Sequence, residues 1–121
     1  MRRLILGALA VAGATLAAEP ATAEAWSAAY TGTVVATYAD GHAVKVFIEP
    51  GHTFTIRPTS GDPLTGTWKD EGSQTCFSIT APAAAAGGAA TCIADKDYKV
   101  GDGFDGKDAT GQFHAVINAG R

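Results

Sequence analysis

The sequence predicts an all-β protein, an antiparallel meander of seven or eight short strands that forms a small barrel or half-barrel. Runs of β-branched and aromatic residues recur at short spacing, and Gly, Pro and Asp separate them. No stretch after residue 25 keeps apolar residues at the i, i+3, i+4 spacing of a helix. The short connections favour antiparallel neighbours, because parallel ones need crossovers of about a dozen residues. A long meander must also hide its edges, which favours closure.

The strands follow one another at hairpin spacing. Asp40-Gly41 is a strong hairpin dipeptide between the first two runs. In the second run Val44, Val46 and Ile48 fall on one face, because side chains alternate along a strand. The predicted strands cover residues 30–38, 43–49, 53–57, 64–69, 75–80, 91–94 and 112–118. The predicted core consists of Trp68, Phe54, Ile56, Val44, Val46, Ile48 and Phe113.

Two later segments break this rhythm. Residues 81–90 are almost entirely Ala and Gly, and we interpret them as a flexible loop between two cysteine-bearing strands. Residues 95–108 are rich in Asp, Gly and Lys, with Tyr98, Val100 and Phe104 as the expected buried contacts. The second segment leaves open whether there are seven strands or eight.

Residues 1–25 are predicted to be a cleaved signal peptide, which leaves a single β domain over residues 26–121. A basic start, Met1-Arg2-Arg3, precedes an uncharged run at residues 4–18. As a helix that run would rise about 22 Å, short of the ~30 Å hydrocarbon core of a bilayer. We therefore expect no stable membrane anchor after cleavage.

Two cleavage signals of the A-x-A type lie at the end of this leader. Ala23-Glu24-Ala25 predicts a mature start at Trp26, and the preceding signal would start the chain at Glu24 instead. Either cut predicts a periplasmic or secreted protein.

The charge of the predicted mature chain argues against nucleic acid as a partner. It carries five Lys and two Arg against ten Asp and Glu, a net charge of −3. Binding to a phosphate backbone needs a basic patch, and this chain does not provide one.

The two cysteines are predicted to form a disulfide. Cys76 and Cys92 lie in neighbouring strand-like runs on either side of the loop at residues 81–90. An isolated cysteine pair in an exported protein is most often oxidised.

A recurring pattern covers most of the predicted mature chain. It consists of residues 47–55, Gly66-Thr67-Trp68, Gly72, Cys76, Val100-Gly101-Asp102 and the final Gly120-Arg121. This pattern resembles an uncharacterised group of small exported lipocalin-like β-barrel domains of Gram-negative bacteria. The resemblance implies fold and compartment, and it implies no activity.

No catalytic, cofactor-binding or metal-binding site is predicted. His42, His52 and His114 include no pair at ligand spacing, and we interpret them as surface residues. The acids Asp95 and Asp97 fit the first positions of a calcium loop, but Lys99 and Gly106 stand where further ligands would be needed.

The serines and the aromatic residues give no clear functional signal either. No serine lies in a G-x-S-x-G elbow. Trp26, Tyr30, Tyr38 and Trp68 could line a ligand pocket, but core and rim positions are the commoner use of such aromatics.

The preferred functional hypothesis is a non-catalytic exported (periplasmic) module that binds an unknown protein or small-molecule ligand. The alternatives are a small envelope hydrolase or enzyme-inhibitor-like effector, and a structural envelope protein. A filled interior would favour binding through the surface, whereas a shaped cavity with a buried carboxylate or histidine would favour an enzyme.

Overall fold

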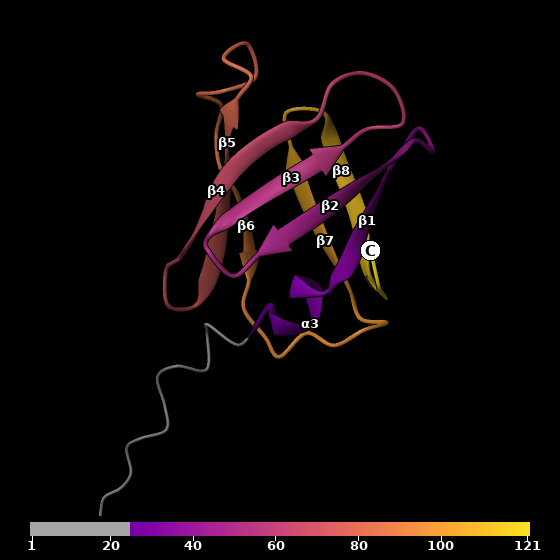
Figure 1. Cartoon of the computed structure of the whole chain (residues 1–121), viewed down its shortest axis with the longest axis vertical. Coiled ribbons are helices and arrows are strands. Elements are labelled where there is room, and N and C mark those ends of the chain that lie inside the picture. Colours follow the sequence, from indigo (N-terminus) through magenta and orange to yellow (C-terminus); the bar gives the residue numbers. More distant parts are fainter. Residues whose placement is uncertain (1–24) are drawn as a thin grey trace, which may run out of the picture.

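The computed structural model describes residues 25–121, so the predicted signal peptide lies outside these residues except for Ala25. The described chain forms eight strands and one short helix, which confirms the all-β fold class (Figure 1). The elements are α3 (Ser27–Tyr30), β1 (Gly32–Tyr38), β2 (Ala43–Glu49), β3 (Thr53–Arg57), β4 (Leu64–Asp70), β5 (Gln74–Ala81), β6 (Thr91–Ala94), β7 (Gly103–Asp108) and β8 (Gly111–Ala119).

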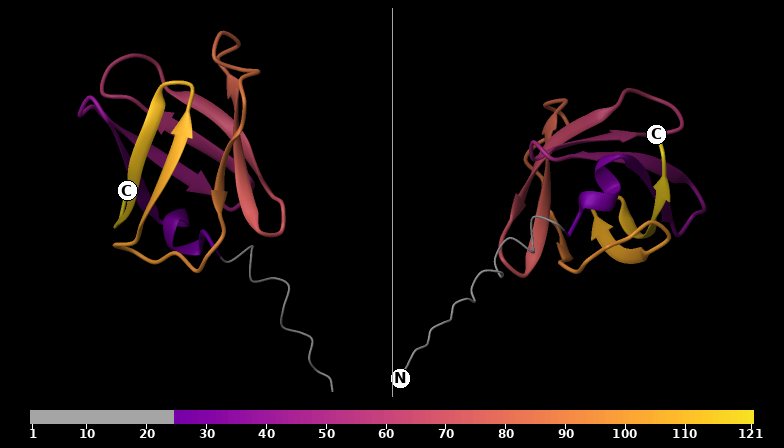
Figure 2. Two further views of the ribbon diagram at one scale, coloured as in Figure 1. Left: turned by 180° about the vertical axis from the view of Figure 1, so that it is seen from behind. Right: turned by 60° about the horizontal axis from the view of Figure 1, so that its bottom comes forward.

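The strands form one antiparallel sheet that curls into a nearly closed barrel. Their order is β6-β5-β4-β3-β2-β1-β8-β7, and each paired neighbour is antiparallel. The two edge strands, β6 and β7, are consecutive in the chain and come side by side where the sheet returns on itself (Figures 1 and 2). Across this seam the Thr91 hydroxyl donates to the Lys107 carbonyl at 3.2 Å.

Two elements differ from the sequence prediction. The strand expected from Tyr30 begins at Gly32, because Tyr30 belongs to the one-turn helix α3. The segment rich in Asp and Gly contains β7, whose Phe104 lies opposite Ala115 of β8. Pairing with β8 therefore overrides the low strand propensity of this segment.

No helix of residues 25–121 is long and apolar enough to cross a membrane.

An aromatic cluster closes one end of the barrel. Trp26, just before α3, is 0% exposed, and its ring stacks on Tyr98 with centroids 4.6 Å apart. The edges of Phe77 and Phe104 meet the same indole at 5.6 and 5.3 Å. When this end is turned forward, α3 lies within the ring of strands (Figure 2). The segment that precedes β1 thus forms the floor of the barrel.

The predicted core divides into two groups. Ile48, Phe54 and Trp68 are between 2% and 4% exposed, as expected for core residues. The other four predicted members are only half-buried, although they point inward: Val44, Val46, Ile56 and Phe113. These four side chains still pack against the buried cluster, so the prediction of one core holds for their contacts but not for full burial. Their shared environment is a hollow interior.

Arg121 holds the start and end of the described chain together. Its guanidinium donates to the carbonyls of Gly32, Ala29 and Ile48 at 2.8 to 3.0 Å and to a carboxylate oxygen of Glu49 at 2.6 Å. These partners belong to β1, α3 and β2, so one side chain fixes the helix against the first two strands. The five donors of a guanidinium make such multiple bonding geometrically easy.

Candidate functional site: an apolar cavity in the barrel

The barrel encloses a cavity of about 780 Å³, which lies within the size range of small-molecule sites. Its walls come from the inward-facing positions of every strand, and its base rests on Ile48, Phe54, Phe77 and Phe104. Four connections border its mouth at the end away from α3. They are the β1–β2 turn, the β3–β4 loop, the β5–β6 loop and the β7–β8 turn.

The deep part of the cavity is apolar. Val34, Val46, Ile56 and Ile79 contribute aliphatic wall. Several of these side chains stay partly exposed because the interior is not filled by the protein itself. An apolar guest would remove that surface from water, which is favourable in proportion to the area covered.

The polar and ionisable lining residues gather at the mouth. Tyr38 at the end of β1 donates its hydroxyl to a carboxylate oxygen of Asp108 at 2.6 Å, which joins β1 to the end of β7. The other Asp108 oxygen accepts the backbone N–H groups of Thr110 and Gly111 at 2.8 and 3.2 Å. Burial, followed by this hydrogen bond and the charge of Asp108, raises the pKa of Tyr38 above its usual value. The phenol therefore stays a donor, and Asp108 is held in one position.

His42 extends this polar rim. Its ring stacks on Tyr38 with centroids 4.6 Å apart, and its Nδ1 lies 2.5 Å from a carboxylate oxygen of Asp40. Thr59 and Ser60 of the β3–β4 loop complete the polar side of the mouth. Across from them, the β5–β6 loop contributes only small apolar residues, namely Ala85, Gly88, Ala89 and Ala90.

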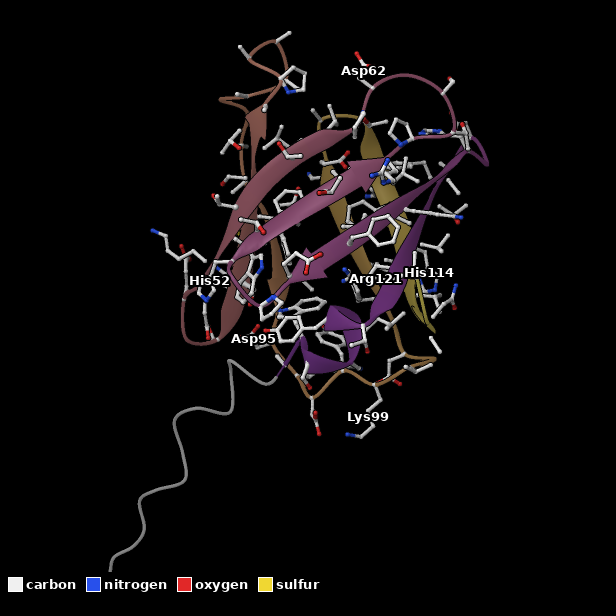
Figure 3. All side chains as sticks on the ribbon, in the orientation of Figure 1. His52, Asp62, Asp95, Lys99, His114 and Arg121 are labelled. Carbon is white, nitrogen blue, oxygen red and sulfur yellow. A yellow bond between two sulfur atoms is a disulfide. The ribbon has the colours of Figure 1, made fainter. Side chains whose placement is uncertain are left out.

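The three histidines lie far apart in the fold. His52 is in the turn between β2 and β3, with φ at 70°, and its ring stacks on Trp68 at 4.0 Å. His114 lies on the outer face and pairs with Asp105 at 2.8 Å, away from the mouth that holds His42 (Figure 3). Within residues 25–121 no three His, Cys, Asp or Glu side chains are grouped so that they could hold a metal ion.

The acids considered for calcium are also dispersed. Asp97 pairs with the Lys99 ammonium at 2.9 Å, while Asp102 accepts the Lys99 backbone N–H at 3.0 Å. Asp105 faces outward and Asp108 lies at the mouth. Asp97 and Asp102 thus share Lys99 as a partner, Asp105 and Asp108 serve other contacts, and residues 25–121 assemble no calcium loop from these acids.

A polar chain crosses the floor of the barrel. The Trp26 indole N–H donates to the Thr75 hydroxyl at 3.1 Å, and that hydroxyl donates to Asp95 at 2.7 Å. Burial raises the pKa of the Asp95 carboxyl, the Thr75 hydrogen bond opposes this, and the carboxyl of Asp70 adds to the rise. These groups lie beneath the cavity and do not line it.

Asp95→Asn should make the stability of the domain less dependent on pH. A carboxyl with a raised folded-state pKa stabilises the fold while protonated, and this contribution is lost as pH rises through the folded-state pKa. The asparagine can still accept the Thr75 hydroxyl but never ionises. We expect urea titrations between about pH 3 and about pH 7 to show that the free energy of unfolding of the variant increases relative to that of the wild type as pH rises.

The neighbouring variant Asp97→Asn provides the control, because that carboxylate is exposed and paired with Lys99. Its free energy of unfolding should not increase in this way relative to the wild type. If the Asp95→Asn variant instead became steadily less stable than the wild type from acidic to neutral pH, the ionised Asp95 would be stabilising and the assigned role of Asp95 would be wrong.

Most of this site could not be recognised from the sequence. Core and rim positions were the expected use of the aromatic residues; Trp26 and Trp68 are buried as expected, whereas Tyr38 lines the mouth of the cavity. In the sequence, Asp108 is one of several acids in the segment of residues 95–108 that is rich in Asp, Gly and Lys. The available signal was that Asp108 ends a series of alternate residues that face inward, Phe104-Gly106-Asp108. This series can be recognised only once residues 103–108 are known to form the strand β7.

Comparisons with protein-family models, with curated proteins and with solved structures found no match to this chain. Any inference about function therefore depends on the geometry of the barrel and its cavity.

Proposed function

We propose that this domain is a non-catalytic, exported (periplasmic) binding module that holds an apolar small molecule inside its barrel. The observation that supports this most is the open cavity of about 780 Å³, whose deep walls are aliphatic and aromatic side chains left partly exposed. Ligand sites have this character: mostly apolar walls with a few polar groups that orient the guest.

The Cys76–Cys92 disulfide is compatible with an oxidising compartment, and the resemblance to exported lipocalin-like domains points the same way. The hydrolase alternative has less support. The ionisable side chains that line the cavity are Tyr38, His42, Lys107 and Asp108. Both oxygens of Asp108 already accept hydrogen bonds.

Binding can be tested with N-phenyl-1-naphthylamine, an uncharged dye whose fluorescence rises in apolar surroundings. We expect saturable binding of one dye per domain. Val46→Trp should weaken binding at least about tenfold, since Val46 lies mid-wall between Val34 and Ile56 and the indole would fill the space.

The matched control is Lys45→Trp. Lys45 precedes Val46, is exposed and faces the outside, so the same indole there should leave the affinity unchanged. Circular dichroism should show both variants folded. Equal dye binding by the wild type and Val46→Trp would place the dye elsewhere and contradict the proposed function.

A further inference from the structure

We propose that the ligand of this cavity is an amphiphile with an apolar body and a cationic head, and that the head lies at the mouth beside Asp108. This inference rests on the proposed function and adds the chemical class of the ligand. It follows from where charged and apolar side chains are placed around the cavity.

The cavity separates apolar from polar surface along its depth. Its floor and walls, from Phe54 and Phe104 up to Ile79, are apolar except for Thr91, whose hydroxyl already donates to the Lys107 carbonyl. Its mouth carries the hydroxyls of Tyr38, Thr59 and Ser60. A guest that is apolar throughout would leave these groups uncontacted, whereas an amphiphile satisfies both ends.

The charge at the mouth is negative. Asp40 lies in the β1–β2 turn, Asp62 in the β3–β4 loop and Asp108 at the β7–β8 turn, and Figure 3 shows Asp62 at this end of the molecule. The connections at residues 39–42, 58–63, 82–90 and 109–110 contain no Lys or Arg. The mouth therefore favours a cation over an anion.

The nearest basic side chains belong to strands and are exposed. Arg57 follows the inward Ile56 and is not part of the cavity lining. Lys107 belongs to the lining, but it precedes the inward Asp108 and is exposed, so strand alternation directs its ammonium toward the outer face. Neither Asp62 nor Asp108 takes part in an ion pair within residues 25–121. Their charge remains available to a guest.

Asp108 is the carboxylate best placed to select the head. It faces inward, lines the cavity and is fixed by Tyr38 and the turn that follows it. A carboxylate already held in position loses little freedom when a cation arrives. The adjacent Tyr38 ring adds aromatic surface, which attracts ammonium groups.

The test compares three ligands that share an n-decyl chain and differ in the head: trimethylammonium, hydroxyl and carboxylate. Each displaces N-phenyl-1-naphthylamine from the wild-type domain below its micelle concentration. We expect the trimethylammonium ligand to bind about tenfold more tightly than the carboxylate at low salt, with the alcohol between them. Added salt should narrow this difference.

Asp108→Asn should reduce the preference for the trimethylammonium ligand over the carboxylate ligand several-fold. Asp105→Asn is the matched control, because Asp105 lies three positions earlier on the outer face of β7. Should Asp108→Asn fail to fold, the double variant Asp40→Asn, Asp62→Asn on the exposed rim should weaken the same preference.

Equal affinities, or tighter binding of the carboxylate, would overturn the cationic head while leaving the proposed function intact. Dye binding without displacement by any decyl ligand would overturn the chain-bearing amphiphile. Absence of dye binding in the cavity would instead refute the proposed function itself.

Discussion

Trp26→Ala should destabilise the domain by about 3–5 kcal/mol, the usual cost of deleting a fully buried aromatic side chain. The ring of Trp26 is 0% exposed and packs between Tyr98, Phe77 and Phe104. Its loss also leaves the Thr75 hydroxyl without the indole donor, at a site where Thr75 itself is buried. A domain of this size has only about 5–15 kcal/mol of stability in total, so the effect should be easy to measure by urea denaturation.

Trp26→Phe separates packing from hydrogen bonding. It keeps an aromatic ring against Tyr98 but removes the indole N–H, so we expect it to cost clearly less than the alanine variant. A loss below about 1 kcal/mol for Trp26→Ala would mean that the segment before α3 does not form the floor of the barrel.

Removal of the Cys76–Cys92 disulfide should cost about 3 kcal/mol. The two cysteines lie directly opposite each other on β5 and β6, and the crosslink closes a loop with a sequence separation of 16. In the chain-entropy model a loop of about this length accounts for roughly 3 kcal/mol, because the crosslink restricts the unfolded chain. The double variant Cys76→Ala, Cys92→Ala measures this loss in urea.

The wild type treated with a reductant is the control for lost packing, because reduction breaks the crosslink and keeps both sulfur atoms. Reduction and double substitution should destabilise the domain to a similar extent. Alkylation of the denatured protein, after expression from the full sequence with its predicted signal peptide, should label no cysteine before reduction and both afterwards. Two labels without reduction would contradict the disulfide.

Much of the architecture could be predicted because it depends on local patterns. The alternation of Val44, Val46 and Ile48 identified the inward face of β2, and Asp40-Gly41 marked the turn before it. Chain-local signals of this kind extend over a few residues, and they located seven of the eight strands. The missed strand, Gly103–Asp108, has a turn-like composition and is held as a strand by its partner β8.

The sequence by itself determined the antiparallel meander, the inward positions and the pairing of the two cysteines, because alternation, turn residues and short connections are read along the chain. Only the tertiary structure decided that the barrel interior is hollow. Whether inward side chains meet one another or surround a space depends on strand number and curvature, which involve contacts between distant segments. The same long-range closure placed Trp26 beneath the cavity and brought Tyr38 to Asp108, a pair 70 positions apart in the chain.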